Sequence, residues 1–317
     1  KKSFPNTLPP DLIAAEKKNL QGYIMKLKKG LKLKERFLSI ETPEECNNIT
    51  LFRYAGTFLG MWNIEGCFIL VDNIFIDSGN PNYSRKTMRS YLATLDKKRE
   101  WLILNTHMHE DHVGGNRLIQ NELGAEIYTP ESVQDFSFVS GLMDLVWGRP
   151  KLFRYNMIDR EVYTTDRGRT IEVIPAPGHS PDHTVYRIMP DNIIYSGDAI
   201  PVPARKRYVT LGEDYVTELG SLKKMLKYAE AGTRFISAHH GIVSDSVKLI
   251  QARIAGMTGV VDRVTEAAAA GITGVEQIGR EVFGKPEFLY STLGNQLRCR
   301  EDWTIQSILD SLEMTNI

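Results

Sequence analysis

The 317 residues, 42% hydrophobic and 25% charged, are typical of a water-soluble globular protein with one large domain, or with one domain and an appendage. The 39 basic and 39 acidic side chains balance, which excludes a global attraction to nucleic acid and leaves only a local basic patch for such binding. No apolar run approaches the ~20 residues that cross a bilayer, and no signal-peptide core is visible, so we expect a cytoplasmic protein without a transmembrane segment.

The cysteines agree with that compartment. Cys46, Cys67 and Cys299 are odd in number and widely spaced. This pattern argues against a disulfide framework and favours a reducing environment. We expect buried or incidental thiols.

Residues 1–44 predict a basic helical extension. A helix is expected from Asp11, after Pro9-Pro10, to near Gly30. Its apolar residues partly follow helical spacing, with lysines at the other positions. Such a helix can touch a membrane surface or nucleic acid. Packing against its own domain or a partner subunit is the more common use, and we favour it.

Strand-like runs follow at residues 49–54, 67–71 and 74–76, which predict a hairpin-rich first sheet layer. Residues 84–95 then predict a helix, residues 101–104 a short buried strand and residues 116–123 a second helix. The alternation of strand and helix indicates a layered α/β fold.

All seven histidines fall into three short clusters, and the first directly follows the strand at 101–104. It contains His107, His109, Asp111 and His112, whereas Glu110 between them is expected to be a solvated loop charge. Imidazole and carboxylate are the groups that hold zinc and similar ions. Their spacing does not share one helical face, so a compact turn is needed to direct them inward. The cluster therefore predicts a binuclear metal site.

Three further strand ends supply candidate ligands. His179 follows the strand-like residues 171–174, Asp198 follows 192–197, and His240 follows 234–238. Ligand sites in open α/β folds gather at the carboxyl ends of the strands, where loops converge. We therefore expect these side chains to join the first cluster.

The motifs together resemble the metallo-β-lactamase superfamily, in its glyoxalase II-like branch. The matching features are H-x-H-x-D-H at 107–112, His179 in Pro-Gly-His, Asp198 in Ser-Gly-Asp, His240-Gly241 and the earlier strand-end Asp77. The resemblance spans roughly residues 50–245. It implies a four-layer αββα sandwich over residues 45–245, flanked by the N-terminal helical extension and by a C-terminal helical appendage at 246–317.

The resemblance also implies the ligand sets. His107, His109 and His179 would hold one divalent ion, Asp111, His112 and His240 the second, and Asp198 would bridge them. Zinc suits the nitrogen-rich sets best, although iron and manganese accept the same ligands. A hydroxide shared by the ions would attack a carbonyl or phosphorus, which makes the reaction a hydrolysis. Asp111 is also the candidate catalytic residue that orients this nucleophile.

Other residues near the motifs receive supporting or structural roles. Asp77 and His183 are expected to lie one shell outside the metals, where such partners fix ligand orientation. His239 would point away from His240 if this stretch is extended, because successive side chains of a strand face opposite sides.

Two connecting stretches are candidates for substrate selection. Residues 131–160 are rich in bulky apolar side chains, which could line a pocket, form a homodimer contact or build a helix pair over the sheet. A basic loop could hold an anionic substrate over the metals or be merely solvated; its residues are Arg205, Lys206, Arg207 and Tyr208. Helices are expected at 246–253, 260–270, 274–283 and 303–312, where they could cover the site or reach a second subunit.

We predict a metal-dependent hydrolase of a small ester, thioester or other anionic metabolite. A phosphodiesterase or ribonuclease is the first alternative, since two-metal chemistry suits it equally, but nucleic acid is not the favoured partner. An iron-dependent persulfide dioxygenase would use only His107 or His109, His179 and Asp198. A non-catalytic ligand sensor is the last alternative, and its hallmark would be a missing ligand, which the motifs do not show.

Overall fold

The computed structural model describes residues 37–58, 62–83, 85–130, 148–200, 209–210, 212–285 and 299–315. Three expectations lie outside these residues. They are the basic helix within 1–36, the part 131–147 of the apolar stretch 131–160, and the basic loop containing Arg205, Lys206, Arg207 and Tyr208.

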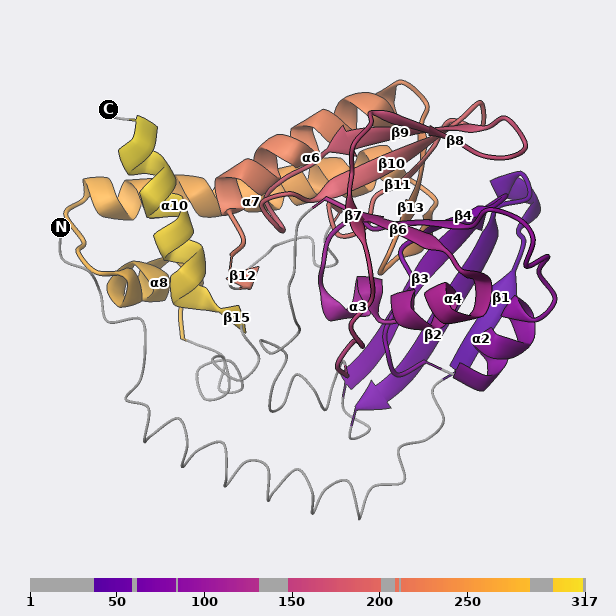
Figure 1. The fold of residues 1–317 in the computed structure, drawn as a ribbon. Coiled ribbons are helices and arrows are strands. Elements are labelled where there is room, and N and C mark those ends of the chain that lie inside the picture. The colour runs from indigo at the N-terminus through magenta and orange to yellow at the C-terminus, as the bar shows by residue number, and fades with distance from the viewer. Residues whose placement is uncertain are drawn as a thin grey trace, which may run out of the picture.

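Two large β-sheets form the centre of the described molecule (Figure 1). The first runs in the order β1-β2-β3-β4-β5-β6-β7, and the second in the order β14-β13-β11-β10-β9-β8. The strands of the first sheet are β1 (Phe37–Glu41), β2 (Thr50–Phe58), β3 (Trp62–Val71), β4 (Ile74–Ile76), β5 (Leu102–Leu104), β6 (Glu126–Thr129) and β7 (Asn156–Met157). Those of the second are β8 (Val162–Thr164), β9 (Thr170–Pro175), β10 (Thr184–Met189), β11 (Ile193–Tyr195), β13 (Arg234–Ser237) and β14 (Gly241–Val243).

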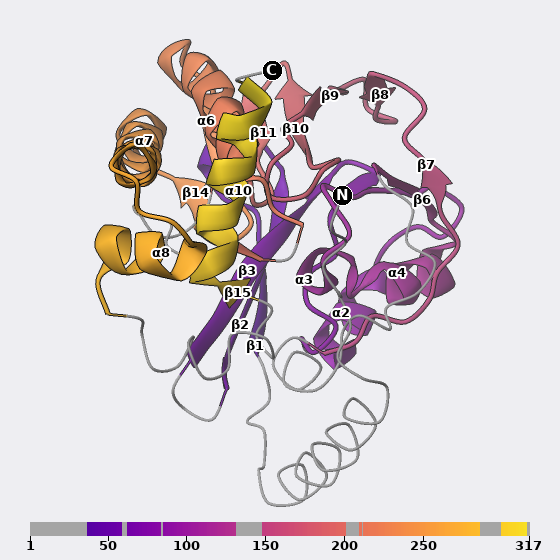
Figure 2. The ribbon, with the colours of Figure 1, turned by 90° about the vertical axis from the view of Figure 1, so that its left-hand side faces the viewer.

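The helices cover the two outer faces of this pair of sheets (Figures 1 and 2). On the first sheet lie α2 (Arg85–Leu92) and α4 (Asn116–Leu123). The one-turn helix α3 (Glu110–Val113) directly precedes α4 in the chain. On the second sheet lie α6 (Tyr215–Glu230) and α7 (Ser246–Ala269). The helices α8 (Val275–Phe283) and α10 (Glu301–Thr315) pack against the ends of α6 and α7, beyond the sheet. Small elements complete the described chain: η1 (Glu44–Cys46) and the pair β12 (Val209–Thr210) and β15 (Cys299–Arg300).

Alternation along the strands explains the layers. In β3, Ile69 packs into the core between the sheets, whereas Phe68 and Leu70 face α2 and α4. In β11, Tyr195 faces the inter-sheet core and Ile194 packs with the C-terminal helices. Because side chains of a strand alternate between faces, strands apolar on both sides require cover on both sides. The predicted αββα sandwich is confirmed.

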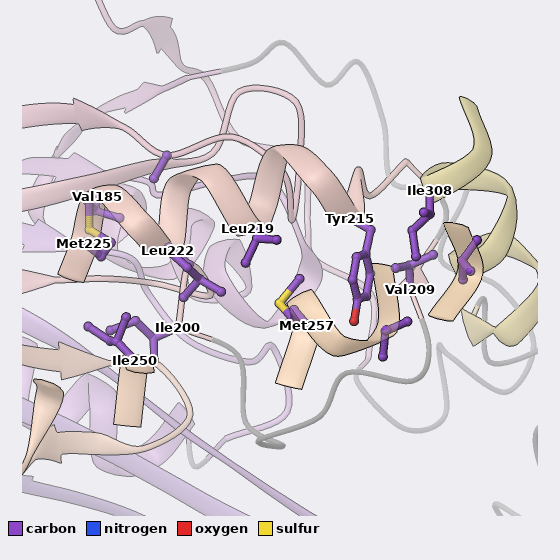
Figure 3. Close-up of a cluster of buried hydrophobic side chains, with 14 of the residues drawn as sticks. Val185, Ile200, Val209, Tyr215, Leu219, Leu222, Met225, Ile250, Met257 and Ile308 are labelled. Atoms are coloured by element: carbon purple, nitrogen blue, oxygen red, sulfur yellow. The ribbon is translucent and has the colours of Figure 1, made fainter. Parts of the chain in front are cut away.

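The C-terminal helices share one apolar core with the second sheet (Figure 3). Leu222 and Met225 of α6 pack in the same cluster as Ile250 of α7 and Ile308 of α10. The backbone N–H of Tyr215 also donates to Ser307 Oγ at 2.9 Å, which fixes α10 to the start of α6. Among the described helices, none is both long and apolar enough to cross a bilayer.

The structure differs from the expected elements in several places. Residues 37–41, expected within the helical extension, form β1 and pair with β2, so the first sheet starts before residue 45. The helix α6 was not predicted. The stretches 246–253 and 260–270 form the single helix α7, because core packing of Met257 and Val260 outweighs the low helix propensity of Gly256 and Gly259.

Candidate metal centre

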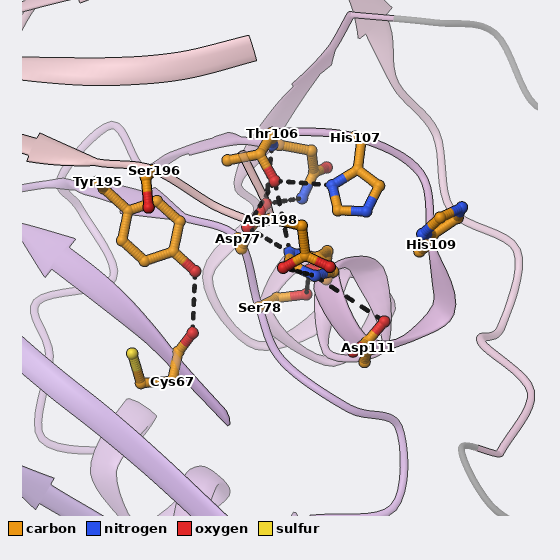
Figure 4. Close-up of polar contacts among 12 residues, drawn as sticks. Cys67, Asp77, Ser78, Thr106, His107, His109, Asp111, Tyr195, Ser196 and Asp198 are labelled. Atoms are coloured by element: carbon orange, nitrogen blue, oxygen red, sulfur yellow. Dashed lines mark hydrogen bonds and ion pairs between the residues drawn. The ribbon is translucent and has the colours of Figure 1, made fainter. Parts of the chain in front are cut away.

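Four strand ends bring imidazole and carboxylate groups to one place. Figure 4 shows His107, His109, Asp111 and Asp198 from two of them. Within the described residues they form three overlapping groups, in each of which the potential ligand atoms lie within 4.8 Å of one another. The groups are His107 with His109 and His179, His107 with His112 and Asp198, and Asp111 with His112 and His239.

Asp198 lies between the two sides of this cluster. Its Oδ2 is 3.3 Å from His179 Nε2, which faces His109 Nδ1 at 3.0 Å. Its Oδ1 is 3.3 Å from His112 Nε2 and 3.3 Å from His239 Nε2. On that second side, Asp111 Oδ2 lies 3.6 Å from His239 Nε2. The two oxygens of one carboxylate therefore address two separate ligand sets.

Two buried carboxylates contact histidines of the cluster through Nδ1, the ring nitrogen that faces away from the other ligands. Asp77 Oδ2 is 2.7 Å from His112 Nδ1, and the same side chain accepts hydrogen bonds from the N–H and the hydroxyl of Thr106. Glu213 Oε1 is 2.8 Å from His179 Nδ1, and Glu213 Oε2 accepts from the N–H of Thr210. These contacts leave Nε2 of both imidazoles facing the cluster, which is the arrangement that orients metal-binding histidines.

His183 supports the loop that carries Asp198. It is fully buried, and its Nε2 accepts the Asp198 backbone N–H at 3.2 Å. The preceding Gly197 has φ +49, and a Cβ there would lie 2.9 Å from His183 Nε2 and 2.8 Å from Thr106 Oγ1. Glycine is needed at this position because both the backbone conformation and the space require it.

The turn α3 presents Asp111 and His112 to the cluster. Ser78 N–H donates to His112 O at 2.7 Å, and Tyr54 Oη donates to Asp111 O at 3.3 Å. This fold of the turn also buries Glu110, which is 5% exposed. The expectation that Glu110 is a solvated loop charge is therefore wrong.

The residues present fit divalent metal ions. His107 Nε2 is buried and has no hydrogen-bond partner, and His112 Nε2 and Asp198 Oδ1 are buried without a well-aligned hydrogen bond, although they lie 3.3 Å apart. Buried polar atoms are nearly always satisfied, so unsatisfied lone pairs that converge on one point indicate a bound cation. A set of imidazole nitrogens and carboxylate oxygens is the donor set of zinc, iron or manganese.

A family model agrees with this geometry. The model of the metallo-β-lactamase superfamily matches residues 69–248, which is more than half of the chain. The chain belongs to the metallo-β-lactamase superfamily. The resemblance inferred from the motifs is thus confirmed.

Curated relatives of this superfamily member are distant. "Beta-lactamase-like protein 2 homolog" of Caenorhabditis elegans is 25% identical over 179 residues, which are 56% of this chain and 55% of that protein. "Atrochrysone carboxyl ACP thioesterase" of Aspergillus fumigatus is 25% identical over 202 residues, 62% of this chain and 57% of that one. "Hydroxyacylglutathione hydrolase" of Erythrobacter litoralis is 31% identical over 107 residues, 33% and 37% of the two chains. The chain spans little more than half the length of the first two relatives.

Solved structures show the same superfamily fold. A metallo-β-lactamase family protein from Thermus thermophilus has a TM-score of 0.54 at 16% identity, covering 90% of this chain and 95% of that one. A metallo-β-lactamase from Pontibacter korlensis has a TM-score of 0.51 at 15% identity, covering 70% and 99%.

The structure reverses the expectation for the last histidine pair of the superfamily motif. His239, not His240, lies beside Asp111 and Asp198, and His240 belongs to none of the three groups. The reason is local: β13 ends at Ser237, and residues 238–240 form a turn. The alternation of an extended strand therefore does not apply there. His239 Nδ1 is held 3.1 Å from the carbonyl oxygen of Glu65 on β3.

Motif analysis missed Glu213. This residue is 34 positions from His179 and belongs to no local pattern, so only the tertiary fold joins the two. The one local signal was the helix cap beside it: Asp214 accepts the Thr217 N–H, and Asp214 N–H donates to Gly178 O. Recognising α6 from that cap would have placed Glu213 next to the His179 loop.

Burial and neighbouring charges divide the histidines into two classes. Burial, reinforced by His112, lowers the pKa of His107 well below its usual range, and burial with His179 lowers the pKa of His109 to about 4. Burial also disfavours charge on His239, but Asp198 outweighs it and raises the pKa of His239 to about 9. The pKa of His112 is likewise raised, against burial, by Asp198 and the other carboxylates. The cationic histidines and Asp198 are thus mutually stabilised where an ion would bind.

Proposed function

We propose that this chain is a binuclear metal-dependent hydrolase that cleaves a small ester or thioester. The observation that carries the proposal is the position of Asp198, whose two oxygens face two separate sets of imidazole and carboxylate ligands. Histidines of both sets are oriented by a further carboxylate, Glu213 or Asp77. A purely structural polar cluster would not need this doubled arrangement.

The ligand assignment follows the measured contacts. We assign His107, His109 and His179 to one ion, Asp111, His112 and His239 to the other, and Asp198 to both. Two bound divalent ions would supply hydroxide near neutral pH by lowering the pKa of water to roughly 7, and would polarise the bond to be cleaved. Zinc is our first choice for both positions.

The chain's own residues position the reacting groups. Glu213 and Asp77 fix the orientation of His179 and His112 through their Nδ1 atoms. Asp111 is largely buried beside His239, where its carboxylate is placed to orient an attacking water and to hold its proton. His183 keeps Asp198 in place through the backbone N–H. We retain the loop of Arg205, Lys206, Arg207 and Tyr208 as the proposed contact for an anionic substrate.

Esters and thioesters are the favoured class because two of the curated relatives are named a carboxyl ACP thioesterase and a hydroxyacylglutathione hydrolase. A mononuclear oxygenase would leave Asp111, His112 and His239 without a role. A sensor without turnover would lack a ligand, whereas each proposed set has three residues whose ligand atoms lie within 4.8 Å of one another.

The deciding experiment measures metal content and turnover on one sample. Protein purified without added metal is analysed for elements and assayed with esters, thioesters and phosphodiesters. We expect about two zinc ions per chain and thioester hydrolysis, with both lost in Asp198→Ala. One iron ion per chain with oxygen consumption would refute the proposal, and turnover restricted to phosphodiesters would replace its substrate class.

A further inference from the structure

A cavity lies away from the metal-ligand groups, between helices α2 and α4 on the outer face of the first sheet. Its volume is about 60 Å³, and among its lining residues in the described chain four are basic and none is acidic. The basic residues are Arg85 and Arg89 from α2, Arg117 from α4 and Lys151. Three separate segments thus direct positive charge at one small space.

The charge of this cavity is largely uncompensated. Glu122 neutralises one cation, because its Oε1 lies 3.3 Å from Arg89 Nε. Arg85 is directed by a hydrogen bond from its Nη2 to Pro81 O at 3.1 Å, which neutralises no charge. Among the described residues no acidic partner is found for the other three cations, and like charges gathered in this way repel one another, so the arrangement favours an anion between them.

The walls of the cavity are closely packed backbone. A Cβ at Gly114 would lie 2.1 Å from Pro81 N, and a Cβ at Gly148 would lie 2.3 Å from Asn82 Nδ2. The segment that contains Gly148 and Lys151 is therefore packed against the loop 80–83. Gly115 also caps α4, whose amino-terminal end adds a partial positive charge. The site is therefore built by fixed elements and not only by surface side chains.

An unsatisfied hydroxyl belongs to the same wall. Tyr83 lines the cavity and is 4% exposed, yet its Oη has no hydrogen-bond partner. The hydroxyl lies against Gly115, where an added Cβ would be 2.2 Å away. A buried donor is nearly always satisfied, which makes Tyr83 a second and independent indication of a missing partner.

We propose that this cavity binds a phosphate group. Its volume of about 60 Å³ exceeds the roughly 15 Å³ that one water needs, and suits a tetrahedral oxyanion better than a larger ligand. The planar guanidinium groups can donate two hydrogen bonds each to phosphate oxygens, and a phosphate of charge about −1.5 to −2 can pair with several cations at once. Because Gly114 and Gly115 lie two and three residues after His112, a bound phosphate contacts the end of the turn that carries part of the metal centre.

The test titrates inorganic phosphate into metal-loaded full-length protein at constant ionic strength, followed by calorimetry. Arg117→Gln/Lys151→Gln removes two of the cations, and Lys223→Gln/Lys248→Gln removes the same charge from exposed positions on α6 and α7. We expect the first pair to weaken phosphate binding about ten-fold or more, since each charged hydrogen bond is worth about one such step, and the second pair to change it less than about two-fold. If the first pair does not fold, Arg85→Gln/Lys151→Gln replaces it.

Phosphate that binds only at the metals would overturn the proposal. In that case binding is unchanged in Arg117→Gln/Lys151→Gln and lost in Asp198→Ala. The source of the phosphate is separated by assaying one thioester with and without a terminal phosphate. If Arg117→Gln/Lys151→Gln raises the KM of the phosphorylated thioester alone, the phosphate belongs to the substrate. If this variant loses phosphate binding but both KM values stay unchanged, the phosphate is a separate ligand. The calorimetric outcomes are independent of whether the metal centre hydrolyses thioesters, whereas the KM comparison requires that activity.

Discussion

Glu213 holds His179 by a 2.8 Å contact to Nδ1 and is itself fixed by the Thr210 N–H. We predict that Glu213→Ala lowers metal affinity about 10–100-fold, the usual cost of losing a residue that orients a ligand. Competition with a zinc chelator measures this. Glu213→Gln keeps a hydrogen-bond acceptor but not the charge, so its zinc affinity should lie between those of the unaltered protein and Glu213→Ala.

Glu230→Ala is the matched control, because this glutamate is exposed at the far end of α6, the helix that begins two residues after Glu213. Equal zinc affinity in Glu213→Ala and the control would show that His179 does not depend on its carboxylate partner.

His239 and His240 provide a direct test of the ligand assignment. His239 Nε2 lies 3.3 Å from Asp198 Oδ1, whereas His240 is outside the metal-competent groups. We expect His239→Ala to lose about one metal ion per chain and at least about 100-fold in turnover, since an incomplete site loses its Lewis acid. His240→Ala should keep both ions. The opposite result would restore the assignment made from the motif.

The pH dependence of the metal-stripped protein has a defined sign. The pKa of His239 is raised from 6.5 to about 9, against burial, by Asp198. The folded protein therefore holds a proton that the unfolded chain has lost, and stability present below 6.5 is lost as the pH rises through 9. The pKa of His109 is lowered from 6.5 to about 4 by burial and His179, so stability is instead lost as the pH falls through that range.

We therefore predict that the melting temperature of chelator-treated protein is highest near pH 6.5. It should fall by a few degrees toward pH 9, which corresponds to roughly 1 kcal/mol or more. Thermal melts across this range measure the effect, and His239→Ala should flatten its alkaline side. A melting temperature that rises steadily to pH 9 would contradict the prediction.

At the scale of single residues, the sequence predicted which residue types could bind metal better than it predicted which side chains come together. His107, His109, Asp111 and His112 could be grouped because they are adjacent in the chain. The choice of His239 depended on a turn after β13, whose backbone the strand pattern does not specify.

Between β9 and β10, the connecting loop requires glycine before His179. Gly178 has φ +132, and a Cβ there would lie 2.3 Å from both N and Cα of Glu218 at the start of α6. Gly178→Ala should lower stability by about 1–3 kcal/mol, as expected for a strained backbone, and should also weaken metal binding by displacing His179.

Gly168→Ala separates the two effects. Gly168 also has a positive φ, +84, in the turn between β8 and β9, but nothing lies within 4 Å of its added Cβ. We expect this control to lose stability without losing metal. Denaturant unfolding and chelator competition measure both quantities, and equal metal affinity in the two variants would exclude a positioning role for Gly178.

The elements were predicted where local patterns are strong. The helix at 116–123 has the predicted bounds because a glycine pair precedes it and Gly124 ends it with a left-handed backbone. The helix α6 was missed because several of its residues are buried by α7 and α10 together, which weakens the amphipathic pattern.

Across the whole molecule, the C-terminal helices and the metal centre are linked through α6. The backbone N–H of its first residue, Tyr215, donates a hydrogen bond to Ser307 Oγ of α10. Glu213, two residues earlier in the chain, contacts His179. The shared core of α6, α7 and α10 makes these helices part of the folding unit that supports the site. Sequence alone could place helices at the C-terminus but not their shared core, because the contacts join residues about 90 positions apart.

The last prediction tests this link. Ile308 of α10 is fully buried in the shared core, so Ile308→Ala should lower the free energy of unfolding by about 2–5 kcal/mol. Because α10 supports the start of α6, urea should release the metal and unfold the helices in one transition, at a lower midpoint than in the unaltered protein. Gln306→Ala, on the exposed face of the same helix, should leave that midpoint nearly unchanged. If the C-terminal helices formed an independent unit, Ile308→Ala would shift the far-ultraviolet signal but not metal release, and the two curves would separate.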